Sequence, residues 1–283
     1  MPTRIVAALV CVLAAACAHT SPPSGSRATP AAQRRFVALV PSLAEDLYAL
    51  GVGDRVIAVS KFTGTAPASV PRVADFQSVD TEKIVALHPD VVVAIPAQAH
   101  LIEPLQHAGV RVELIRDDTF NDIFVGIQTL GTLAGCDDRA RVEIARLRDE
   151  TARLQKRARA FRRRPSVFFA LGTGPIWTVG PSSYLGHLVD LAGGSNAARL
   201  PQPWGEFSEE ALVRANPDAI VAAAEIHLPG VLNREPWRSL RAVREGHVFI
   251  VTDTRAANAL FRPGPRYNEG LRWLIERLTP LAK

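Results

Sequence analysis

The same thirteen-residue pattern occurs twice in the chain, and this internal repeat limits the possible fold more than any other feature. The first copy is Glu82–Ala94 and the second is Glu210–Ala222, so the offset is 128 residues without a gap. Each copy begins with a glutamate, carries Pro-Asp in its middle and ends in four apolar residues. A chain of 283 residues with such a repeat is expected to form two similar lobes.

Each copy of the repeat predicts a short helix, a turn and a buried strand. Asp80 and Ser208 precede the two glutamates and are residue types that cap helix N-termini, where a first-turn glutamate also suits the helix dipole. The residue before each proline is disfavoured in the α conformation, so each helix should end there. The apolar runs Val91–Ala94 and Ala219–Ala222 are typical of strands inside a parallel sheet that is covered on both faces.

The rest of the chain alternates predicted strands with predicted helices. We therefore expect an α/β fold with two Rossmann-like lobes and mainly parallel sheets, at residues 36–136 and 165–283. The further strands are expected at Phe36–Val40, Val110–Ile115, Val167–Leu171 and His247–Val251, and glycine-stopped helices at Leu43–Leu50 and Tyr184–Ala192.

Residues 137–164 are expected to form one long helix that links the lobes and permits only small relative motion. A helix of about 25 residues spans nearly 40 Å. The segment carries eleven Arg or Lys and five Asp or Glu, a balance of +6. We interpret it as a solvated helix face with an anionic membrane surface as a secondary partner, and we expect no nucleic acid partner. Its apolar positions recur every three or four residues: Ile144, Leu147, Thr151, Leu154, Ala158 and Phe161.

The first 35 residues are expected to serve export and not the fold. Residues 1–17 have a positive start, the apolar run Ile5–Ala14 and small residues before Cys17, as in a secretory signal. Cys17 resembles the acylated cysteine of a lipobox, although Leu13 lies one place further from it than usual. Residues 18–35, rich in Ser, Pro and Ala, are expected to be a flexible tether. The only cysteine of the body, Cys136, leaves no internal disulfide.

From Phe36 to the C-terminus the chain resembles the periplasmic binding proteins for cobalamin, ferric siderophores and haem, whose lobes are joined by a single backbone helix. The resemblance implies an exported monomer, periplasmic or at the cell surface, without enzyme activity or cofactor. Such a protein captures a small-molecule nutrient between its lobes and delivers it to the membrane subunits of an ABC importer. The markers are Pro41–Glu45, Val79–Ile84 leading into His88-Pro89-Asp90, the second copy Glu210–Asp218, and Arg262–Arg266.

The two first-turn glutamates of the repeat occupy the positions that dock this family onto its importer. In the family these carboxylates contact arginines of the membrane subunits, which implies that role for Glu82 and Glu210. Two carboxylates far apart on one face would provide orientation and fast association more than raw affinity. The alternative is that each glutamate only serves its own helix N-terminus.

Aromatic residues near predicted strand ends are the candidates for the ligand cleft. Compared with cobalamin-binding members of the family, Phe62 lies where they have Tyr, Phe76 where they have Trp, and Trp204 matches an aromatic directly. Large flat side chains suit a corrin ring, so a corrinoid is the first expectation for the ligand. The candidate set is Phe62, Phe76, Trp177, Tyr184, Trp204, Phe261 and Arg262.

Other ligands remain open within the same fold. An anionic ferric siderophore would need cations such as Arg255, Arg262 and Arg266, and haem would need an axial ligand. A metal ion would need converging His and carboxylates, but the histidines are scattered, so we expect no metal site. The candidates for the haem axial ligand are Tyr184, His187 and Tyr267, and His100 and His107 give only a weak hint of zinc. A nucleophile elbow, a Walker loop and a complete dinucleotide fingerprint are all missing.

Overall fold

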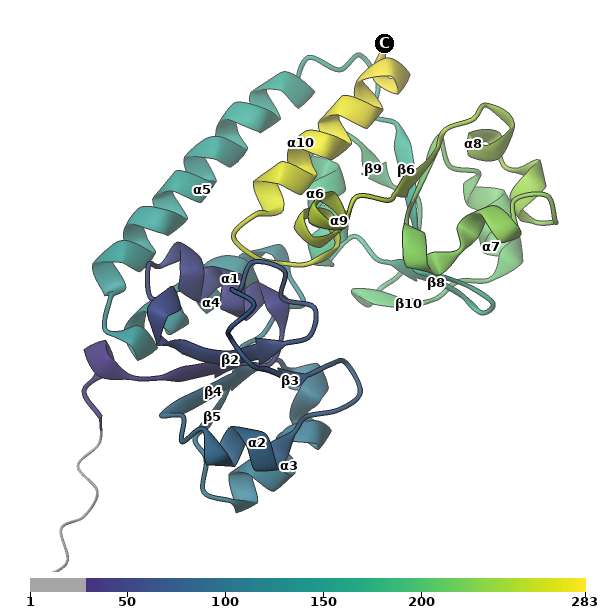
Figure 1. Ribbon diagram of the computed structural model, residues 1–283. Coiled ribbons are helices and arrows are strands. Elements are labelled where there is room, and N and C mark those ends of the chain that lie inside the picture. Colours follow the sequence, from purple (N-terminus) through teal and green to yellow (C-terminus); the bar gives the residue numbers. More distant parts are fainter. Residues whose placement is uncertain (1–28) are drawn as a thin grey trace, which may run out of the picture.

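The computed structural model describes residues 29–283, in which two lobes lie side by side and helix α5 (Asp137–Ala158) joins them along one side (Figure 1). The predicted signal segment, Cys17 and the first part of the predicted tether lie outside the described residues. Among the helices of residues 29–283, none is long and apolar enough to span a membrane.

The N-terminal lobe is built on a five-stranded parallel sheet in the order β3-β2-β1-β4-β5. Alternate residues of β1 bury against α1 and α4 on one face and against α2 and α3 on the other, so both faces are covered. The strands are β1 (Phe36–Ala38), β2 (Val56–Ser60), β3 (Arg72–Ala74), β4 (Val91–Ala94) and β5 (Val112–Leu114), and the helices are α1 (Pro41–Ala49), α2 (Thr81–Ala86), α3 (Ala99–His107) and α4 (Phe120–Ala134).

The C-terminal lobe has a four-stranded parallel sheet in the order β12-β11-β6-β9, which confirms the predicted α/β class. An antiparallel sheet in the order β10-β8-β7 was not predicted from the sequence. The strands are β6 (Ser166–Ala170), β7 (Gly172–Thr173), β8 (Ile176–Val179), β9 (Ser195–Asn196), β10 (Trp204–Glu206), β11 (Ala219–Ala223) and β12 (Val248–Val251), and the helices are α6 (Tyr184–Leu191), α7 (Glu209–Ala215), α8 (Arg241–Arg244), α9 (Thr254–Phe261) and α10 (Tyr267–Leu278).

The two copies of the repeat adopt the same local structure. His88 and Asn216 end α2 and α7 with positive φ angles of 47° and 37°, because the following proline disfavours the right-handed helical conformation. The aspartate after each proline, Asp90 or Asp218, accepts the main-chain N–H at the start of the neighbouring strand at 2.8 Å. The repeated Pro-Asp therefore stops a helix and ties two strands of the sheet together.

Helix α5 ends at Ala158, six residues before the predicted end of the linking helix at residue 164. Phe161 fits the apolar spacing, but its ring packs against the core from a turn that follows the helix. The N–H of Arg162 donates to the carbonyl oxygen of Ala282 at 2.9 Å and not to an α5 carbonyl. Apolar spacing alone could not tell this turn from another helical turn.

The lobes touch directly beside α5 and share one hydrophobic cluster. Phe120 of α4 stacks on His187 of α6 with ring centroids 4.6 Å apart, and it meets Tyr267 of α10 edge to face at 5.0 Å. The N–H of Tyr184 donates to the carbonyl oxygen of Asp118 at 3.1 Å. The junction between the lobes is therefore a packed interface and not only a helix.

Residues 29–35 are ordered against the N-terminal lobe, so the expectation of a flexible tether up to residue 35 is wrong for them. Ala31–Gln33 forms a short 3-10 turn. Arg55 donates to the carbonyl oxygens of Ala31 and Ala134 at 3.1 Å, which fixes this turn to the end of α4. The composition of the segment is polar, but partners distant in the sequence hold it.

Candidate ligand cleft and docking glutamates

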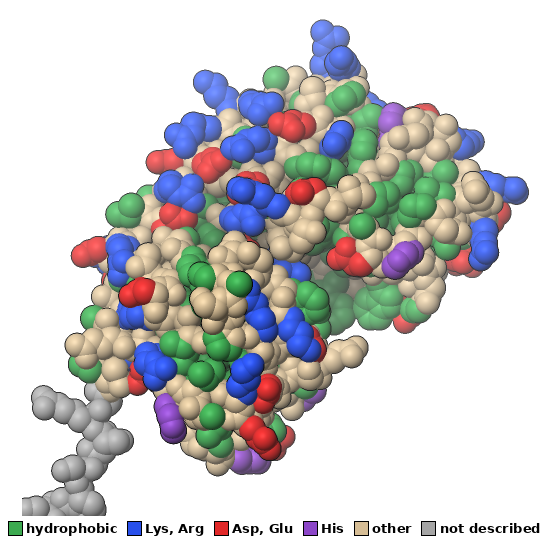
Figure 2. All heavy atoms as spheres, viewed as in Figure 1, with side chains coloured by type: hydrophobic (Ala, Val, Ile, Leu, Met, Phe, Trp, Pro, Cys, Tyr) green, Lys and Arg blue, Asp and Glu red, His purple; other side chains and the backbone are tan. Residues whose placement is uncertain are grey.

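The surface is hollowed between the two lobes, and hydrophobic side chains gather around the hollow (Figure 2). The loops that follow β2 and β3 border it from the N-terminal lobe, and strands β8 and β10 border it from the C-terminal lobe (Figure 1). Loops at the carboxyl ends of parallel strands are the usual place for ligands in open α/β sheets. We call this hollow the cleft.

The N-terminal lobe contributes a stacked pair of phenylalanines. Phe62 follows β2 and Phe76 follows β3, and their ring centroids lie 4.9 Å apart with the planes 19° from parallel. Both side chains are exposed, at 44% and 60%. A 2.8 Å ion pair between Lys61 and Asp75 ties the two loops together and lowers the pKa of the Asp75 carboxyl. The loops therefore present an apolar platform to solvent, in a place where no core covers it.

The C-terminal lobe contributes a pair of tryptophans from the antiparallel sheet. Trp204 in β10 and Trp177 in β8 are diagonal neighbours across the two strands, since Glu206 lies opposite Trp177. Their ring centroids are 5.7 Å apart, and Trp204 is 57% exposed. The sequence placed both residues in the cleft but could not predict the strand pairing that brings them together.

Arg262 connects the two sides of the cleft. It follows α9 in the C-terminal lobe, and its guanidinium carbon lies 5.9 Å from the ring centroid of Phe76 in the N-terminal lobe. Its Nη1 is buried and has no hydrogen-bond partner among the described residues. Desolvation lowers the pKa of Arg262, while Glu45 and Glu225 oppose that shift. A partly desolvated guanidinium beside an exposed aromatic platform is suited to a ligand oxygen.

Two of the predicted cleft residues belong to the core. Tyr184 is only 4% exposed, its hydroxyl donates to the carbonyl oxygen of Ala259 at 3.3 Å, and burial raises its pKa well above the usual range. The expectation that Tyr184 lines the cleft is therefore wrong, because it faces the junction between the lobes. Phe261 is partly buried and packs edge to face on Phe169 at 5.9 Å, so most of its ring serves packing.

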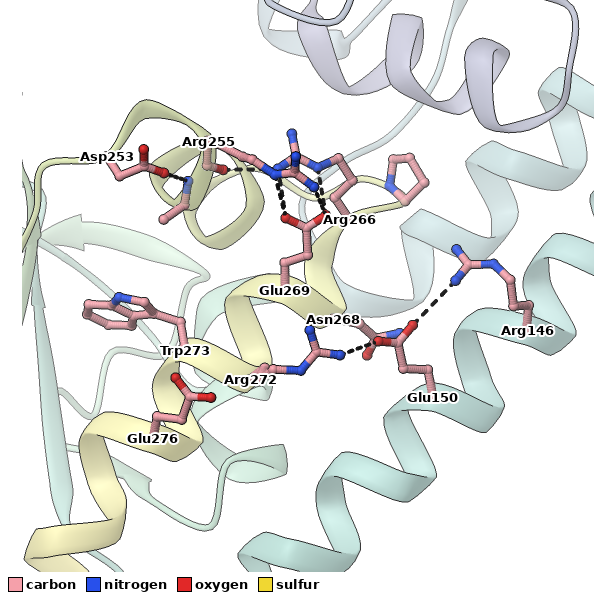
Figure 3. Close-up of a pocket in the computed structure, with 12 residues that line it drawn as sticks. Arg146, Glu150, Asp253, Arg255, Arg266, Asn268, Glu269, Arg272, Trp273 and Glu276 are labelled. Atoms are coloured by element: carbon pink, nitrogen blue, oxygen red, sulfur yellow. Dashed lines mark hydrogen bonds and ion pairs between the residues drawn. The ribbon is translucent and has the colours of Figure 1, made fainter.

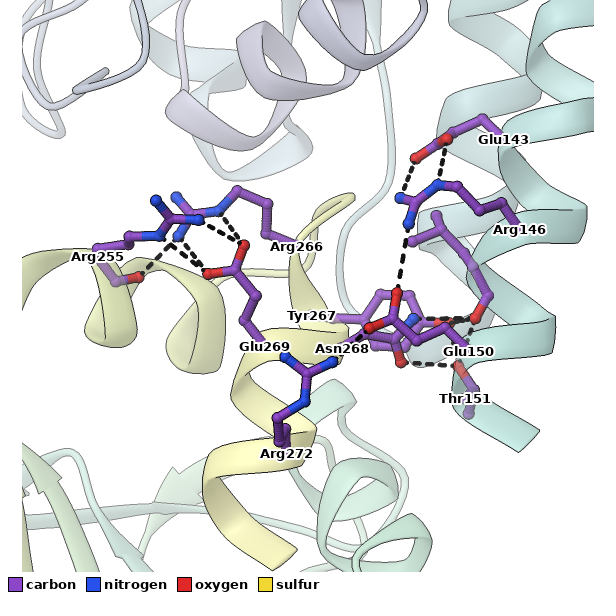
Figure 4. Close-up of polar contacts among 11 residues, drawn as sticks. Glu143, Arg146, Glu150, Thr151, Arg255, Arg266, Tyr267, Asn268, Glu269 and Arg272 are labelled. Carbon is purple, nitrogen blue, oxygen red and sulfur yellow. Dashed lines mark hydrogen bonds and ion pairs between the residues drawn. The ribbon is translucent and has the colours of Figure 1, made fainter. Parts of the chain in front are cut away.

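Ion pairs that the sequence did not predict lie around α10 (Figures 3 and 4). Glu269 of α10 pairs with Arg255 at 3.2 Å and with Arg266 at 2.9 Å. The hydrogen bond from Arg266 lowers the pKa of Glu269 to about 2. Arg266 also lies 3.8 Å from the nearly buried Glu45 of α1. Two family markers far apart in the sequence, 41–45 and 262–266, thus meet across the lobe junction.

Buried hydrogen bonds lock α10 to the middle of α5 (Figure 4). Asn268 Nδ2 donates to the carbonyl oxygen of Leu147 at 2.9 Å, and the Tyr267 hydroxyl donates to the same oxygen at 3.2 Å. The Thr151 hydroxyl donates to Asn268 Oδ1 at 3.0 Å. Thr151 occupies an apolar position of the helical spacing, and its polar role there could not be read from that pattern.

These contacts bear on the alternatives to a corrinoid. Tyr184 and Tyr267 are buried, so neither tyrosine is an open axial ligand for haem, whereas His187 stacks on Phe120 and remains exposed. Arg255 and Arg266 are paired with Glu269, whereas Arg262, the third candidate cation for an anionic siderophore, has no ion-pair partner among the described residues. Residues 29–283 contain no group of three or more His, Cys, Asp or Glu side chains that could hold a metal ion.

Glu82 and Glu210 occupy equivalent, exposed places in the two lobes. Each is the second residue of its helix, in α2 and α7, and both side chains are exposed. The N-caps are supplied by other residues, since Asp80 accepts the N–H of Lys83 at 3.0 Å and Ser208 caps α7 in the same way. Both helices lie away from α5, on opposite sides of the cleft (Figure 1).

One of these glutamates also serves its own helix. Hydrogen bonds from its own main-chain N–H and from the Ser208 hydroxyl lower the pKa of Glu210. The carboxylate is therefore charged and held near the helix N-terminus. That local role is compatible with contact to a partner because the side chain remains exposed.

A family model described as periplasmic binding protein matches residues 37–254. The chain belongs to this family. An ABC transporter substrate-binding lipoprotein of Bacillus subtilis, YvrC, is 30% identical over 87% of this chain and 80% of its own length. A vitamin B12-binding protein of Vibrio parahaemolyticus is 26% identical over 82% of this chain and 84% of its own length. The predicted membership in the family of substrate-binding proteins of ABC importers is therefore confirmed.

Solved structures share the fold. The vitamin B12-binding protein BtuF of Vibrio cholerae has a TM-score of 0.73 at 24% identity and covers 88% of this chain and 98% of that one. The heme-binding protein RhuT of Roseiflexus has a TM-score of 0.77 at 21% identity and covers 89% of this chain and 100% of that one. At such identities these structures show the architecture and leave the ligand open.

Proposed function

We propose that this substrate-binding protein captures a corrinoid in the cleft and delivers it to an ABC importer. The observation that carries the proposal is an aromatic pair on each lobe, Phe62 with Phe76 and Trp177 with Trp204, of which Phe62, Phe76 and Trp204 are exposed. A corrin is a broad, nearly flat and amphipathic ring, so it offers two faces to such platforms. Relatives named vitamin B12-binding proteins support the same ligand class.

Arg262 gives the cleft a polar contact to match. The rim of a corrin carries amide groups, whose carbonyl oxygens accept hydrogen bonds from a guanidinium. The guanidinium carbon of Arg262 lies 5.9 Å from the centroid of the Phe76 ring, so this cation borders the platform on which a ligand would stack. A neutral ligand that bears amides needs no free cation besides Arg262. This agrees with the pairing of Arg255 and Arg266 with Glu269.

Delivery rests on the two docking glutamates and on a membrane anchor. We assign Glu82 and Glu210 to contacts with basic residues of the importer's membrane subunits, since both are exposed on opposite sides of the cleft. We assign Cys17 to lipid attachment, as the lipoprotein name of the Bacillus subtilis relative suggests. The protein then works as an exported, membrane-anchored monomer that releases its ligand unchanged, without enzyme activity or a resident cofactor.

The test is a ligand panel measured by thermal shift and calorimetry. A ligand present at about 100 times its Kd stabilises the native state by about 2.7 kcal/mol, which a melting curve resolves easily. We expect cobalamin or cobinamide to raise Tm and to bind with a stoichiometry of one. A shift with haem or ferric siderophores alone would contradict the corrinoid assignment and leave the family unchanged.

A further inference from the structure

The outer face of α5 is a basic surface that ligand capture does not use. Leu147, Leu154 and Ala158 bury one side of the helix. Arg153, Lys156 and Arg157, at spacings of three and four, share the opposite side and are exposed. Lys and Arg side chains are frequent on this side of the molecule in the space-filling view, with some Asp and Glu side chains between them (Figure 2).

The cations at the C-terminal end of this surface have no acidic partners in the described part of the chain. Towards the start of α5, Arg146 pairs with Glu143 at 2.6 Å and with Glu150 at 3.3 Å. Within residues 29–283, no acidic side chain lies within 4.0 Å of the basic groups of Arg153, Lys156, Arg157 or Arg162. These four charges therefore remain available to an external anion.

A cavity of about 480 Å³ adjoins this end of α5. Arg157, Arg162 and Lys283 line it, together with apolar side chains that include Phe161 and Ile275, and no acidic side chain is part of the described lining. The three cations could bind the phosphate of a lipid headgroup, and the apolar side chains could contact its acyl chain. The cavity is an observation separate from the charge of the helix face.

The N-terminal segment joins the folded protein at the start of α5, the end of the helix opposite to this cavity (Figure 1). The turn Ala31–Gln33 packs against Gly135, immediately before α5, where an added Cβ would lie 2.9 Å from the nitrogen of Ala32. The chain from Cys17 to residue 29 makes 12 residue-to-residue steps, which span at most about 40 Å when extended. A lipid on Cys17 would therefore keep the start of α5 near the bilayer and make a weak surface contact effectively intramolecular.

We infer that the outer face of α5 and the adjoining cavity bind the headgroups of anionic phospholipids. In this orientation α5 lies on the bilayer, while helices α2 and α7, which carry the docking glutamates, lie on the far side of the molecule from it (Figure 1). The receptor then has a resting position, open to ligand, from which it must turn before it can dock. Surface electrostatics contribute about a factor of five per basic residue near an anionic bilayer.

The experiment is vesicle co-sedimentation with residues 29–283, which contain both lobes and all the contacts described above. This form removes the signal segment and the lipid, so only the folded protein contributes to binding. Vesicles contain either phosphatidylcholine alone or phosphatidylcholine with phosphatidylglycerol, at low and at high salt. We expect binding to the anionic vesicles alone, and weaker binding at high salt, because the contact is electrostatic.

The decisive variant replaces Arg153, Lys156, Arg157 and Arg162 with Gln, which has a similar helix propensity. It should bind anionic vesicles at least about a hundredfold more weakly while its Tm and its ligand affinity stay unchanged. The matched control neutralises four exposed arginines of other surfaces: Arg111, Arg214, Arg234 and Arg244.

Three results would overturn the inference. They are no binding of the unmodified protein to anionic vesicles, equal binding to neutral vesicles, and equal loss in the control and the α5 variant. Neither ligand nor importer is present in the assay. Failure here therefore leaves the proposed function untouched, and failure of the ligand panel leaves this inference untouched.

Discussion

Replacement of Trp204 by Ala should weaken ligand binding by a predictable amount. A tryptophan side chain buries up to about 200 Å², and 57% of Trp204 is exposed before the ligand binds. A stacked ligand therefore covers about 55–115 Å² of it, depending on whether half or all of the exposed area is covered. At about 25 cal/mol per Å² this contact contributes about 1.5–3 kcal/mol. Kd should rise about 10–150-fold.

Isothermal titration with cobinamide measures this change directly. Trp204→Phe should recover much of the affinity because a ring remains in the same place. Val213→Ala is the matched control, since Val213 is 47% exposed on α7 and is not part of either aromatic pair. Affinity within twofold of the unmodified protein for Trp204→Ala, or an equal loss for Val213→Ala, would refute the stacking argument.

Three further predictions concern docking, acid sensitivity and the lobe junction. Glu82→Gln with Glu210→Gln should leave ligand affinity unchanged and abolish uptake into cells, because only the importer contact is lost. Asp117→Asn should raise the free energy of unfolding at pH 7. Burial, and after it the neighbouring Asp118 carboxylate, raise the pKa of Asp117 to about 6. The folded protein therefore loses stability as pH rises from about 4 to 6 and the Asp117 carboxyl loses its proton. Asn268→Ala should lower the free energy of unfolding by about 1–3 kcal/mol in denaturant titrations, because it removes buried hydrogen bonds to α5.

Each of these has a matched control on the surface. The double variant Glu103→Gln with Glu276→Gln also removes two negative charges, but from surfaces outside the docking sites, so uptake should persist. Asp149→Asn should leave the pH profile of stability unaltered, and Asn121→Ala should stay within about 0.5 kcal/mol. Uptake by the glutamate double variant would contradict the docking argument. An unaltered pH profile of stability in Asp117→Asn would contradict the argument from its pKa. Unchanged stability in Asn268→Ala would contradict the argument from its buried hydrogen bonds.

The sequence predicted the architecture well because its signals were local. The repeated Pro-Asp and the apolar runs after it specify a helix stop and a buried strand in each lobe, and the structure shows both. The error at the end of α5 and the error at residues 29–35 have the same origin. In each case a partner far away in the sequence, Ala282 or Arg55, decides what the segment does.

The candidate site could be predicted only in part for a related reason. An aromatic residue after a strand can face solvent or the core, and neighbouring residues do not decide which. Phe62, Phe76 and Trp204 are exposed at the cleft, whereas Tyr184 is buried by packing between the lobes. The contact between Glu45 and Arg266 joins residues from opposite ends of the chain. No spacing pattern predicts such a pair.

A crystal structure of the protein with bound cobalamin tests the central claim most directly. The account predicts the corrin between the phenylalanine pair of one lobe and the tryptophan pair of the other, with the Arg262 guanidinium donating to a side-chain amide oxygen of the ring. A corrin bound elsewhere on the molecule, or contacting only one of the two lobes, would contradict it.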